Sequence, residues 1–253
     1  MTTPELPPLA RILGTGVHPL TNPALVDLIL AWAQAPGPAR VVANHNLHSL
    51  ALWHHHPDLQ AFYAEADAIH ADGMAIVAWA ALKDVRFGRQ HRTGYLDWFE
   101  PFLDRAAASH LRLFWVGSPD DHLVKILGTL RTRWPGLIIE GHHGYFGPED
   151  EPGLMATITA FAPDLVVVGM GMPRQERWIA RWRHHLPRGV FLPCGAAGEY
   201  LAGFHPRAPR WLGQIGLEWA WRLACDPRRL AHRYLIEPLS LLGPALRDFG
   251  TRR

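Results

Sequence analysis

Short apolar runs alternate along this chain with longer segments whose apolar residues recur at helical spacing. Six runs have the length and residue types of strands: 40–43, 68–71, 111–116, 137–140, 165–168 and 189–193. Continuous apolar runs this short are typical of strands that are buried on both faces. Helices are expected between them, for example over 22–32, 74–82 and 94–108. Strands that alternate with helices predict right-handed crossovers and a three-layer α/β fold around a Rossmann-like, mostly parallel sheet.

The segment Asp164–Trp178, DLVVVGMGMPRQERW, shows this pattern most clearly. An apolar strand is followed by two glycines, and Pro173 is expected to be the first residue of a helix. Free N–H groups and the positive end of the helix dipole make such a junction a ready anion site, although it is equally typical of an ordinary connection. Arg174 stands where a dinucleotide fingerprint needs its third glycine, so the pattern disfavours an NAD-binding site.

Polar residues and glycines follow several of the predicted strands. Ligands bind beyond the carboxyl ends of strands in open α/β sheets, so these residues form the candidate binding site. They are Asn44, Asn46, Asp72, Gly73, Gly117, Tyr145, Gly171, Gln175 and Glu176. The pair Ser118-Pro119 also predicts a helix start, with a serine cap and proline at the first helical position.

Asp72 is the strongest candidate for a catalytic role among these residues. It comes directly after a predicted buried strand and before a glycine, where the chain can turn and present the carboxylate. General-base chemistry at a sugar hydroxyl needs a carboxylate in a sheltered site. The alternatives are an Asx turn or a cap on the helix from Met74. Asn44 and Asn46 could bind a sugar or a base, or could form a polar turn.

The composition is that of a globular protein. The chain has 253 residues, of which 48% are hydrophobic and 19% charged, so it can bury a substantial core. Two cysteines offer no disulfide framework, and adjacent histidines lack the separated spacing of zinc ligands. No apolar run approaches the roughly 18 residues that cross a bilayer, and no signal-peptide pattern is visible. We therefore expect a protein that is cytoplasmic or lies on the cytoplasmic membrane from its inner face.

The C-terminal segment differs from the rest in charge. Between Arg207 and Arg253, nine arginines face four acidic residues, a net charge of +5, with tryptophans and leucines among them. We expect an α/β domain over 1–203 and a helical appendage over 204–253, with Leu212, Ile215, Trp219 and Leu223 on one helical face. A basic helix with aromatic residues is typical of an interfacial membrane segment, where each basic residue contributes about 1 kcal/mol at an anionic surface. The alternatives are nucleic-acid binding, which the interleaved apolar residues disfavour, and a solvated helix face.

Several motifs occur together in one order. They are ADG at 71–73, WVGSPDD, GHHGYF, PDLVVVGMGMPRQERW, and RAPRW followed by GLEWAWRL and DPRR. In this combination the chain resembles the WecG/TagA/CpsF family of bacterial glycosyltransferases, glycosyltransferase family 26, from about Arg40 to about Tyr234. The resemblance implies inverting, metal-independent transfer of a sugar from a UDP-sugar to a polyprenyl-pyrophosphate-linked sugar. That reaction belongs to the synthesis of surface polysaccharide, exopolysaccharide or teichoic acid at the inner membrane face.

The resemblance also assigns catalytic roles by motif. The family's DG aspartate, its proposed general base, falls on Asp72. The family's T-x-N falls on 44–46, where Asn46 matches and Asn44 replaces the threonine. The family arginine in R-x-x-G register falls on His91, so we expect the neighbouring Arg92 to contact the pyrophosphate.

The same resemblance predicts which residues bind the donor and which attach to the membrane. The family's P-K/R-Q-E matches 173–176, so uracil and ribose are expected near Gly117, Tyr145 and Gln175, and the pyrophosphate near the helix after Gly171. The family's G-G-A-F-D-F is loosened here to GAAGEY. The basic appendage is expected to attach to an anionic membrane and complete the site. Its contributing arginines are Arg207, Arg210, Arg222, Arg228, Arg229 and Arg233.

The departures at Asn44 and His91 keep one alternative open, a nucleotide-sugar-binding or scaffolding protein of the same pathway that has lost catalysis. We expect no metal or other cofactor and no nucleic-acid partner. The sequence leaves a homo-oligomer open and does not identify the sugar.

Overall fold

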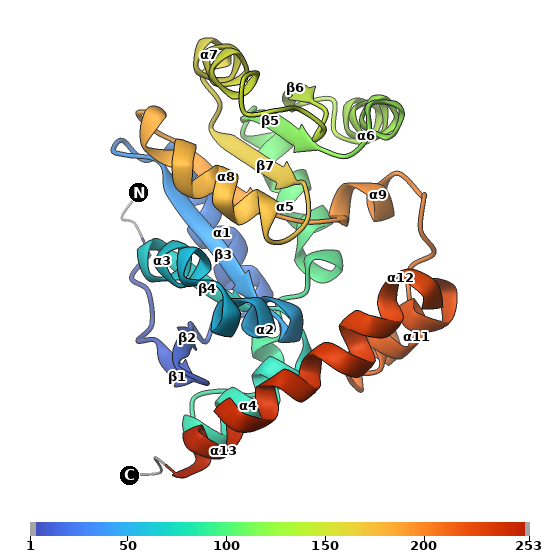
Figure 1. Cartoon of the computed structure of the whole chain (residues 1–253). Helices are drawn as coiled ribbons and strands as arrows, with labels where there is room; N and C mark the ends of the chain where they lie inside the picture. Colours follow the sequence, from blue (N-terminus) through green and yellow to red (C-terminus); the bar gives the residue numbers. More distant parts are fainter. Residues whose placement is uncertain (1–3, 251–253) are drawn as a thin grey trace. The chain divides into compact units, whose positions relative to one another are not determined.

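The computed structural model describes residues 4–250, with the side chains of positions 210 and 214 left aside. Its main sheet has six strands in the order β4-β3-β8-β7-β5-β6 (Figure 1). The strands are β3 (Arg40–His45), β4 (Ala68–Ala71), β5 (Arg112–Gly117), β6 (Ile138–His142), β7 (Leu165–Gly169) and β8 (Val190–Pro193). Helices separate consecutive strands, and β5 pairs in parallel with β6 and β7. The predicted Rossmann-like α/β fold with a C-terminal helical stretch is confirmed.

The described residues cluster into two compact units. Unit 1 contains residues 26–42 and 95–205, together with the first described residues up to Glu5. Unit 2 contains residues 6–25, 43–94 and the described residues from Pro206 onwards. Strand β3 passes from unit 1 into unit 2 after Val42. The expected division into 1–203 and 204–253 stays a prediction.

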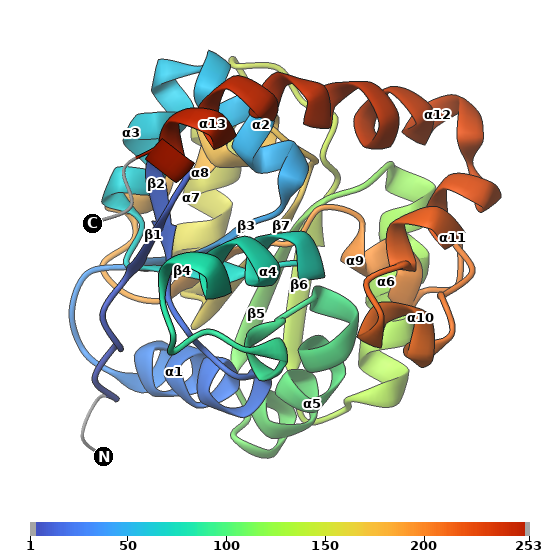
Figure 2. The same cartoon turned by 90° about the horizontal axis from the view of Figure 1, so that it is seen from below.

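Unit 1 carries the central strands. Its helices are most of α1 (Asn22–Gln34), α5 (Tyr95–Ala108), α6 (Asp120–Arg133), α7 (Glu151–Phe161), α8 (Arg174–Trp182) and α9 (Ala197–Leu201), with a 3₁₀ turn, η2, at Arg183–His185. Helices α1 and α5 lie on one face of these strands and α8 on the other (Figures 1 and 2). Every residue of β7 is buried, as predicted for a strand covered on both faces. Buried aromatic residues such as Trp98 and Trp115 fill the space between strands and helices.

Two strand ends in unit 1 meet so closely that only glycine fits there. Gly117 pairs with Gly169 in the register of β5 and β7. The φ of Gly117 is +151°, and a Cβ atom at this position would lie 2.4 Å from the carbonyl oxygen of Gly169. Any side chain at Gly117 would therefore push the two strand ends apart.

Unit 2 combines an N-terminal hairpin, helices that follow β3 and β4, and the C-terminal helices. The hairpin is β1 (Ala10–Ile12) and β2 (Thr15–Val17), and the middle segment holds α2 (Leu47–His55), α3 (Pro57–Glu65), α4 (Met74–Lys83) and a 3₁₀ turn, η1 (Arg89–His91). The C-terminal elements are α10 (Arg210–Gln214), α11 (Glu218–Cys225), α12 (Pro227–Ala231), η3 (His232–Ile236), η4 (Glu237–Leu241) and α13 (Leu242–Gly250). From α12 to α13 they follow one another as a nearly continuous rod beside α2 and α4 (Figure 2).

Asp248 fastens the end of this rod to the rest of unit 2. Its carboxylate accepts hydrogen bonds from the backbone N–H of Leu13 at 3.2 Å and from Nε1 of Trp79 at 2.8 Å. Nζ of Lys83 lies 3.2 Å from the other carboxylate oxygen. Burial by itself would raise the pKa of Asp248, but these donors outweigh burial and lower it. The ionised carboxylate therefore joins α13 to the hairpin and to α4.

Two expected helix starts are wrong. Helix α6 begins at Asp120, with Pro119 at the N-cap and no side-chain cap. Ser118 has a left-handed φ of +64°, and the serine cap predicted there does not form. Helix α8 begins at Arg174, so Pro173 is its N-cap residue and not its first helical residue.

The single apolar helical face expected in the appendage is also wrong. Gly216 has a φ of +81° and lies between α10 and α11, so the helical spacing does not continue past it. Leu212 lies on α10 and Trp219 on α11, so the expected residues do not belong to one helix.

Candidate functional site

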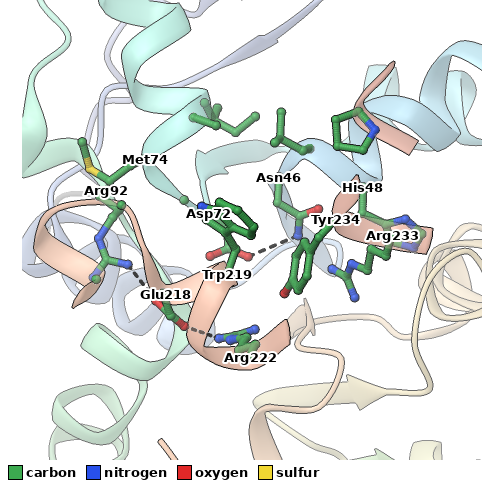
Figure 3. Close-up of a pocket in the computed structure, with 17 residues that line it drawn as sticks. Asn46, His48, Asp72, Met74, Arg92, Glu218, Trp219, Arg222, Arg233 and Tyr234 are labelled. Atoms are coloured by element: carbon green, nitrogen blue, oxygen red, sulfur yellow. Dashed lines mark hydrogen bonds and ion pairs between the residues drawn. The ribbon is translucent and has the colours of Figure 1, made fainter. Parts of the chain in front are cut away.

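Unit 2 contains a pocket of about 390 Å³, within the range typical of small-ligand sites. Four parts of the chain line it: the end of β4 with the start of α4, the start of α2, Arg92 directly after η1, and the C-terminal elements from α10 to η4. All its lining residues belong to unit 2. Figure 3 shows Asp72 at the centre of the labelled side chains.

Asp72 follows the buried strand β4, and its backbone N–H donates to the carbonyl of His45 at 2.8 Å. The next residue, Gly73, is the N-cap of α4 with a φ of +111°, and no side chain caps this helix. The capping alternative for Asp72 is therefore wrong. Gly73 turns the chain away in a conformation that disfavours other residues, which leaves the carboxylate directed into the pocket (Figure 3).

Two asparagine amides hold the Asp72 carboxylate. Nδ2 of Asn46 lies 3.3 Å and Nδ2 of Asn44 3.4 Å from the same oxygen, Oδ2 of Asp72. Burial raises the pKa of Asp72 above its ordinary value, while Arg222, the Asn46 hydrogen bond and Arg233 act in the opposite direction. The result is a carboxylate that is more basic than usual and fixed in position.

The fold determines how Asn46 points. Its Oδ1 accepts the backbone N–H of Ser49 at 3.0 Å, and its own N–H donates to Oγ of Ser49 at 2.8 Å, which makes a capping box for α2. Because the oxygen of the amide is used by the helix, its NH₂ group faces Asp72. Asn46 thus both begins a helix and supports the candidate base.

Arg92 lines the pocket but is held by the appendage. Its Nη1 lies 3.2 Å from Oε2 of Glu218, and Glu218 also binds Arg222 through its other oxygen. A Cβ atom at Gly213 would lie 2.8 Å from Nη2 of Arg92, so the guanidinium lies directly against α10 at this glycine. The expected contact between Arg92 and a pyrophosphate stays a prediction.

The six appendage arginines fall into two groups. Arg222 and Arg233 line the pocket. Nε of Arg233 is buried and has no hydrogen-bond partner within residues 4–250. Arg207, Arg228 and Arg229 are exposed instead, while the side chain of Arg210 lies outside the described set. Sequence proximity therefore grouped residues that the fold places in different surroundings.

Several pocket residues were not predicted from the sequence. Glu218, Trp219 and Tyr234 come from the appendage, and His48 comes from the start of α2. Two glycines of the appendage, Gly213 and Gly216, were the sequence signal that could have revealed its place beside the pocket. At Gly216 a Cβ atom would lie 3.1 Å from the side chain of Met74, so the appendage touches α4 through a residue without a side chain.

The remaining predicted site residues lie in unit 1. Gln175 and Glu176 are each 1% exposed. Oε1 of Gln175 accepts the N–H of Gly195 at 3.1 Å, and its Nε2 donates to Oε1 of Glu176 at 2.8 Å. Tyr145 is 68% exposed, and Gly171 has a φ of +76° at the turn before α8. The contacts of these residues with a donor stay predictions.

Neither a metal centre nor a membrane span occurs in the described part of the chain. Within residues 4–250, no group of three or more histidine, cysteine or acidic residues could hold a metal ion. Over the same residues, every helix is too short or too polar to cross a membrane. The expected independence of a metal stays a prediction.

Comparison with known families matches residues 10–253 to the model of the glycosyl transferase WecG/TagA/CpsF family. The match covers nearly the whole chain, so the chain belongs to this family, and its activity class is glycosyl transfer.

Proposed function

We propose that this chain, as a glycosyltransferase of the WecG/TagA/CpsF family, moves a sugar from a UDP-sugar to a polyprenyl-pyrophosphate-linked sugar in cell-surface polysaccharide synthesis. The observation that carries this proposal is the basic, amide-held carboxylate of Asp72 in a pocket that also holds several arginines. A general base and fixed cations are the two elements that transfer from a nucleotide diphosphate requires.

Asp72 acts as the general base. Both asparagine amides bond to its Oδ2, which leaves Oδ1 for an acceptor hydroxyl. Oδ1 takes the hydroxyl proton while the acceptor oxygen attacks the anomeric carbon of the donor. The bond from that carbon to the diphosphate oxygen breaks on the opposite face, so the anomeric configuration inverts and UDP leaves. The raised pKa of Asp72 favours this proton transfer near neutral pH.

Fixed positive charge stabilises the departing diphosphate. Arg222 and Arg233 line the pocket with Asp72, and residues 73–76 at the uncapped start of α4 line it too. The N-terminus of a helix stabilises anions through its free N–H groups and its dipole. In a sheltered pocket these groups act more strongly than in water, so the reaction needs no metal ion in this proposal.

We also propose that the C-terminal helices lie on the inner face of the cytoplasmic membrane. Leu235, Leu239, Leu242 and Leu246 are each more than half exposed and recur at helical spacing. An exposed leucine stripe together with exposed arginines such as Arg228 suits an anionic lipid surface. This position would bring the pocket close to a lipid-linked acceptor.

The transfer proposal is tested by offering a panel of UDP-sugars with a short-chain polyprenyl-pyrophosphate-sugar acceptor and reading the products by mass spectrometry. We expect one donor to extend the acceptor by a single sugar, with the new linkage of opposite anomeric configuration. If the chain binds UDP but extends no acceptor from any donor, it is instead a nucleotide-sugar-binding protein of the same pathway that has lost catalysis.

The membrane proposal is tested by sedimentation with anionic vesicles. The double variant Leu239→Ser/Leu246→Ser should bind about 5- to 150-fold more weakly, because roughly 1–3 kcal/mol of apolar burial is lost. Val124→Ser on α6 is the matched control, since Val124 is 68% exposed but lies outside the appendage. Equal sedimentation of the double variant and wild type would contradict the proposal.

A further inference from the structure

A histidine–glutamate pair at one end of the pocket has no role in the mechanism above. His48, the second residue of α2, lines the pocket, and its Nδ1 lies 2.5 Å from Oε2 of Glu237 on η4. Their side chains are only 16% and 20% exposed. A carboxylate bound to one ring nitrogen fixes the orientation of a histidine and leaves the other nitrogen, here Nε2, for a ligand.

Arg233 lies beside His48 at this end of the pocket (Figure 3). Glu218 binds both Arg92 and Arg222, but no ion pair is formed by Arg233 within the part of the chain that the structure describes. The carboxylate of Glu237 is already engaged by His48 and, at 3.4 Å, by His232. The charge of Arg233 acts on Asp72 from a distance, but its buried Nε lacks a hydrogen-bond partner among the described residues.

The charge state of His48 depends on the groups that face it. Burial lowers its pKa, Arg233 and His232 lower it further, and Glu237 acts in the opposite direction. The imidazole is therefore neutral in the empty pocket near pH 7. An anion bound to Arg233 would cancel the repulsion from the guanidinium and place negative charge close to Nε2, which favours the protonated ring.

We propose that Arg233 and His48 form a diphosphate-binding subsite, with Glu237 as a positioning residue, and that His48 takes up a proton when the diphosphate binds. This inference rests on the proposed function, since both of the proposed substrates carry a diphosphate. The group that binds belongs either to the UDP of the donor or to the polyprenyl diphosphate of the acceptor.

Calorimetry on the full chain distinguishes these sources and detects the proton directly. UDP and farnesyl diphosphate are each titrated into the protein near pH 7.5, in two buffers that differ in heat of ionisation. For the ligand that occupies the subsite, the apparent binding heat should change with the buffer in the sense of proton uptake. The other ligand should bind with heats that do not depend on the buffer.

Variants identify the group that takes the proton. His48→Gln should abolish the uptake and weaken binding of the same ligand about tenfold, the loss expected for one charge-assisted hydrogen bond. His232→Gln is the matched control, because His232 contacts the same glutamate but is 70% exposed and does not line the pocket. His232 has the smallest of the influences on the pKa of His48, so this variant should retain the uptake and change the affinity by less than about twofold. Glu237→Gln should reduce the uptake while the contact with Arg233 persists.

The wild-type measurement needs no variant, so a folding defect cannot obscure it. Buffer-independent heats for both ligands, or no binding of either, would overturn the subsite, as would uptake that survives in His48→Gln. Transfer activity without uptake would overturn the subsite and leave the proposed function standing. Uptake without transfer from any donor would overturn the function and leave the subsite standing.

Discussion

Two amide–carboxylate pairs in this molecule have the same chemistry but opposite access. In unit 1, Nε2 of Gln175 donates to Glu176 at 2.8 Å, and both residues are 1% exposed. In unit 2, Nδ2 of Asn46 donates to Asp72 at 3.3 Å, and the carboxylate opens into a pocket. Burial raises the pKa of both acids, to about 7 for Glu176. A raised pKa alone therefore does not mark a catalytic acid, and access to a ligand decides between the two.

The two pairs also differ in how many of their polar groups already have hydrogen-bond partners inside the protein. Both polar groups of the Gln175 side chain are used inside unit 1, one by Gly195 and one by Glu176. Around Asp72, one carboxylate oxygen and the guanidinium of Arg233 stay open to the pocket. Contacts inside unit 1 therefore engage the first pair, whereas the second pair keeps polar groups for a ligand, and the donor contacts expected of Gln175 and Glu176 stay predictions.

The largest expected effect is a difference in transfer rate between variants of the two carboxylates, Asp72 and Glu176. Asp72→Asn should lower the rate of sugar transfer by roughly 100- to 10,000-fold, the usual contribution of a general base. Glu176→Gln, which changes the matched carboxylate in unit 1, should keep the rate within about threefold, because Glu176 is enclosed by the protein. Rates measured by mass spectrometry on folded variants check this difference, and the reverse order of effects would refute the comparison.

The next effect concerns the arginines of the appendage. Arg233→Gln should weaken the binding of a diphosphate ligand by about 10- to 100-fold, because a charge-assisted contact in a sheltered site is lost. Arg228→Gln removes the same charge from an exposed position on α12 and should change affinity by less than about twofold. Similar losses in both variants, measured by calorimetry, would mean that net charge and not the pocket governs binding.

The third effect is the pH dependence of stability from Glu176. Its pKa is about 7 in the folded protein against an ordinary 4.5, so the folded state holds a proton that the unfolded state releases. This contribution favours folding at low pH and is lost as pH rises from about 4.5 through 7. The difference is on the order of 3 kcal/mol, given about 1.4 kcal/mol per unit of pKa.

Denaturant unfolding of wild type and Glu176→Gln between pH 5 and 8 measures this contribution. The stability of the variant relative to wild type should increase across that range, since glutamine does not ionise. Parallel pH profiles for the two proteins would show that Glu176 titrates normally and that the enclosed pair is more open than the structure indicates.

The smallest expected effect concerns the anchor that holds the terminal helix rod in unit 2. Asp248→Asn should lower the free energy of unfolding by about 1–2 kcal/mol at pH 7, because the ionic part of its contacts with Trp79 and Lys83 is lost. The lowered pKa of Asp248 means that wild type keeps this contribution above the ordinary value of 3.8 and loses it as pH falls through the lower folded value. Denaturant unfolding at pH 7 and pH 3 checks the sign, and Asp226→Asn, on an exposed ion pair of α12, serves as the control.

Local pattern was sufficient to predict the sheet and the position of Asp72. The run 165–168 lies within β7, and Asp72 follows β4 as expected, because buried strands require continuous apolar residues and turns require glycine. The same reasoning was wrong where one residue changes the backbone. The left-handed φ of Gly216 divides the expected helical face, and that of Ser118 moves the start of α6.

Long-range pairing lay beyond the sequence pattern. Asp72 and Arg233 are far apart in the chain, and nothing in the basic composition of the appendage shows which arginines turn towards the pocket. His48 and Glu237 are separated by 189 positions, and each is unremarkable in its own segment. Such pairs depend on how the C-terminal rod packs against α2, which tertiary contacts decide.

The pH dependence of kcat/KM, measured with the donor found in the panel, shows whether Asp72 is the base for sugar transfer. For wild type, kcat/KM should rise with pH through a group whose pKa lies above that of an ordinary aspartate. That rise should be absent from the residual activity of Asp72→Asn. A variant that keeps the wild-type rate and the same rise with pH would contradict the claim.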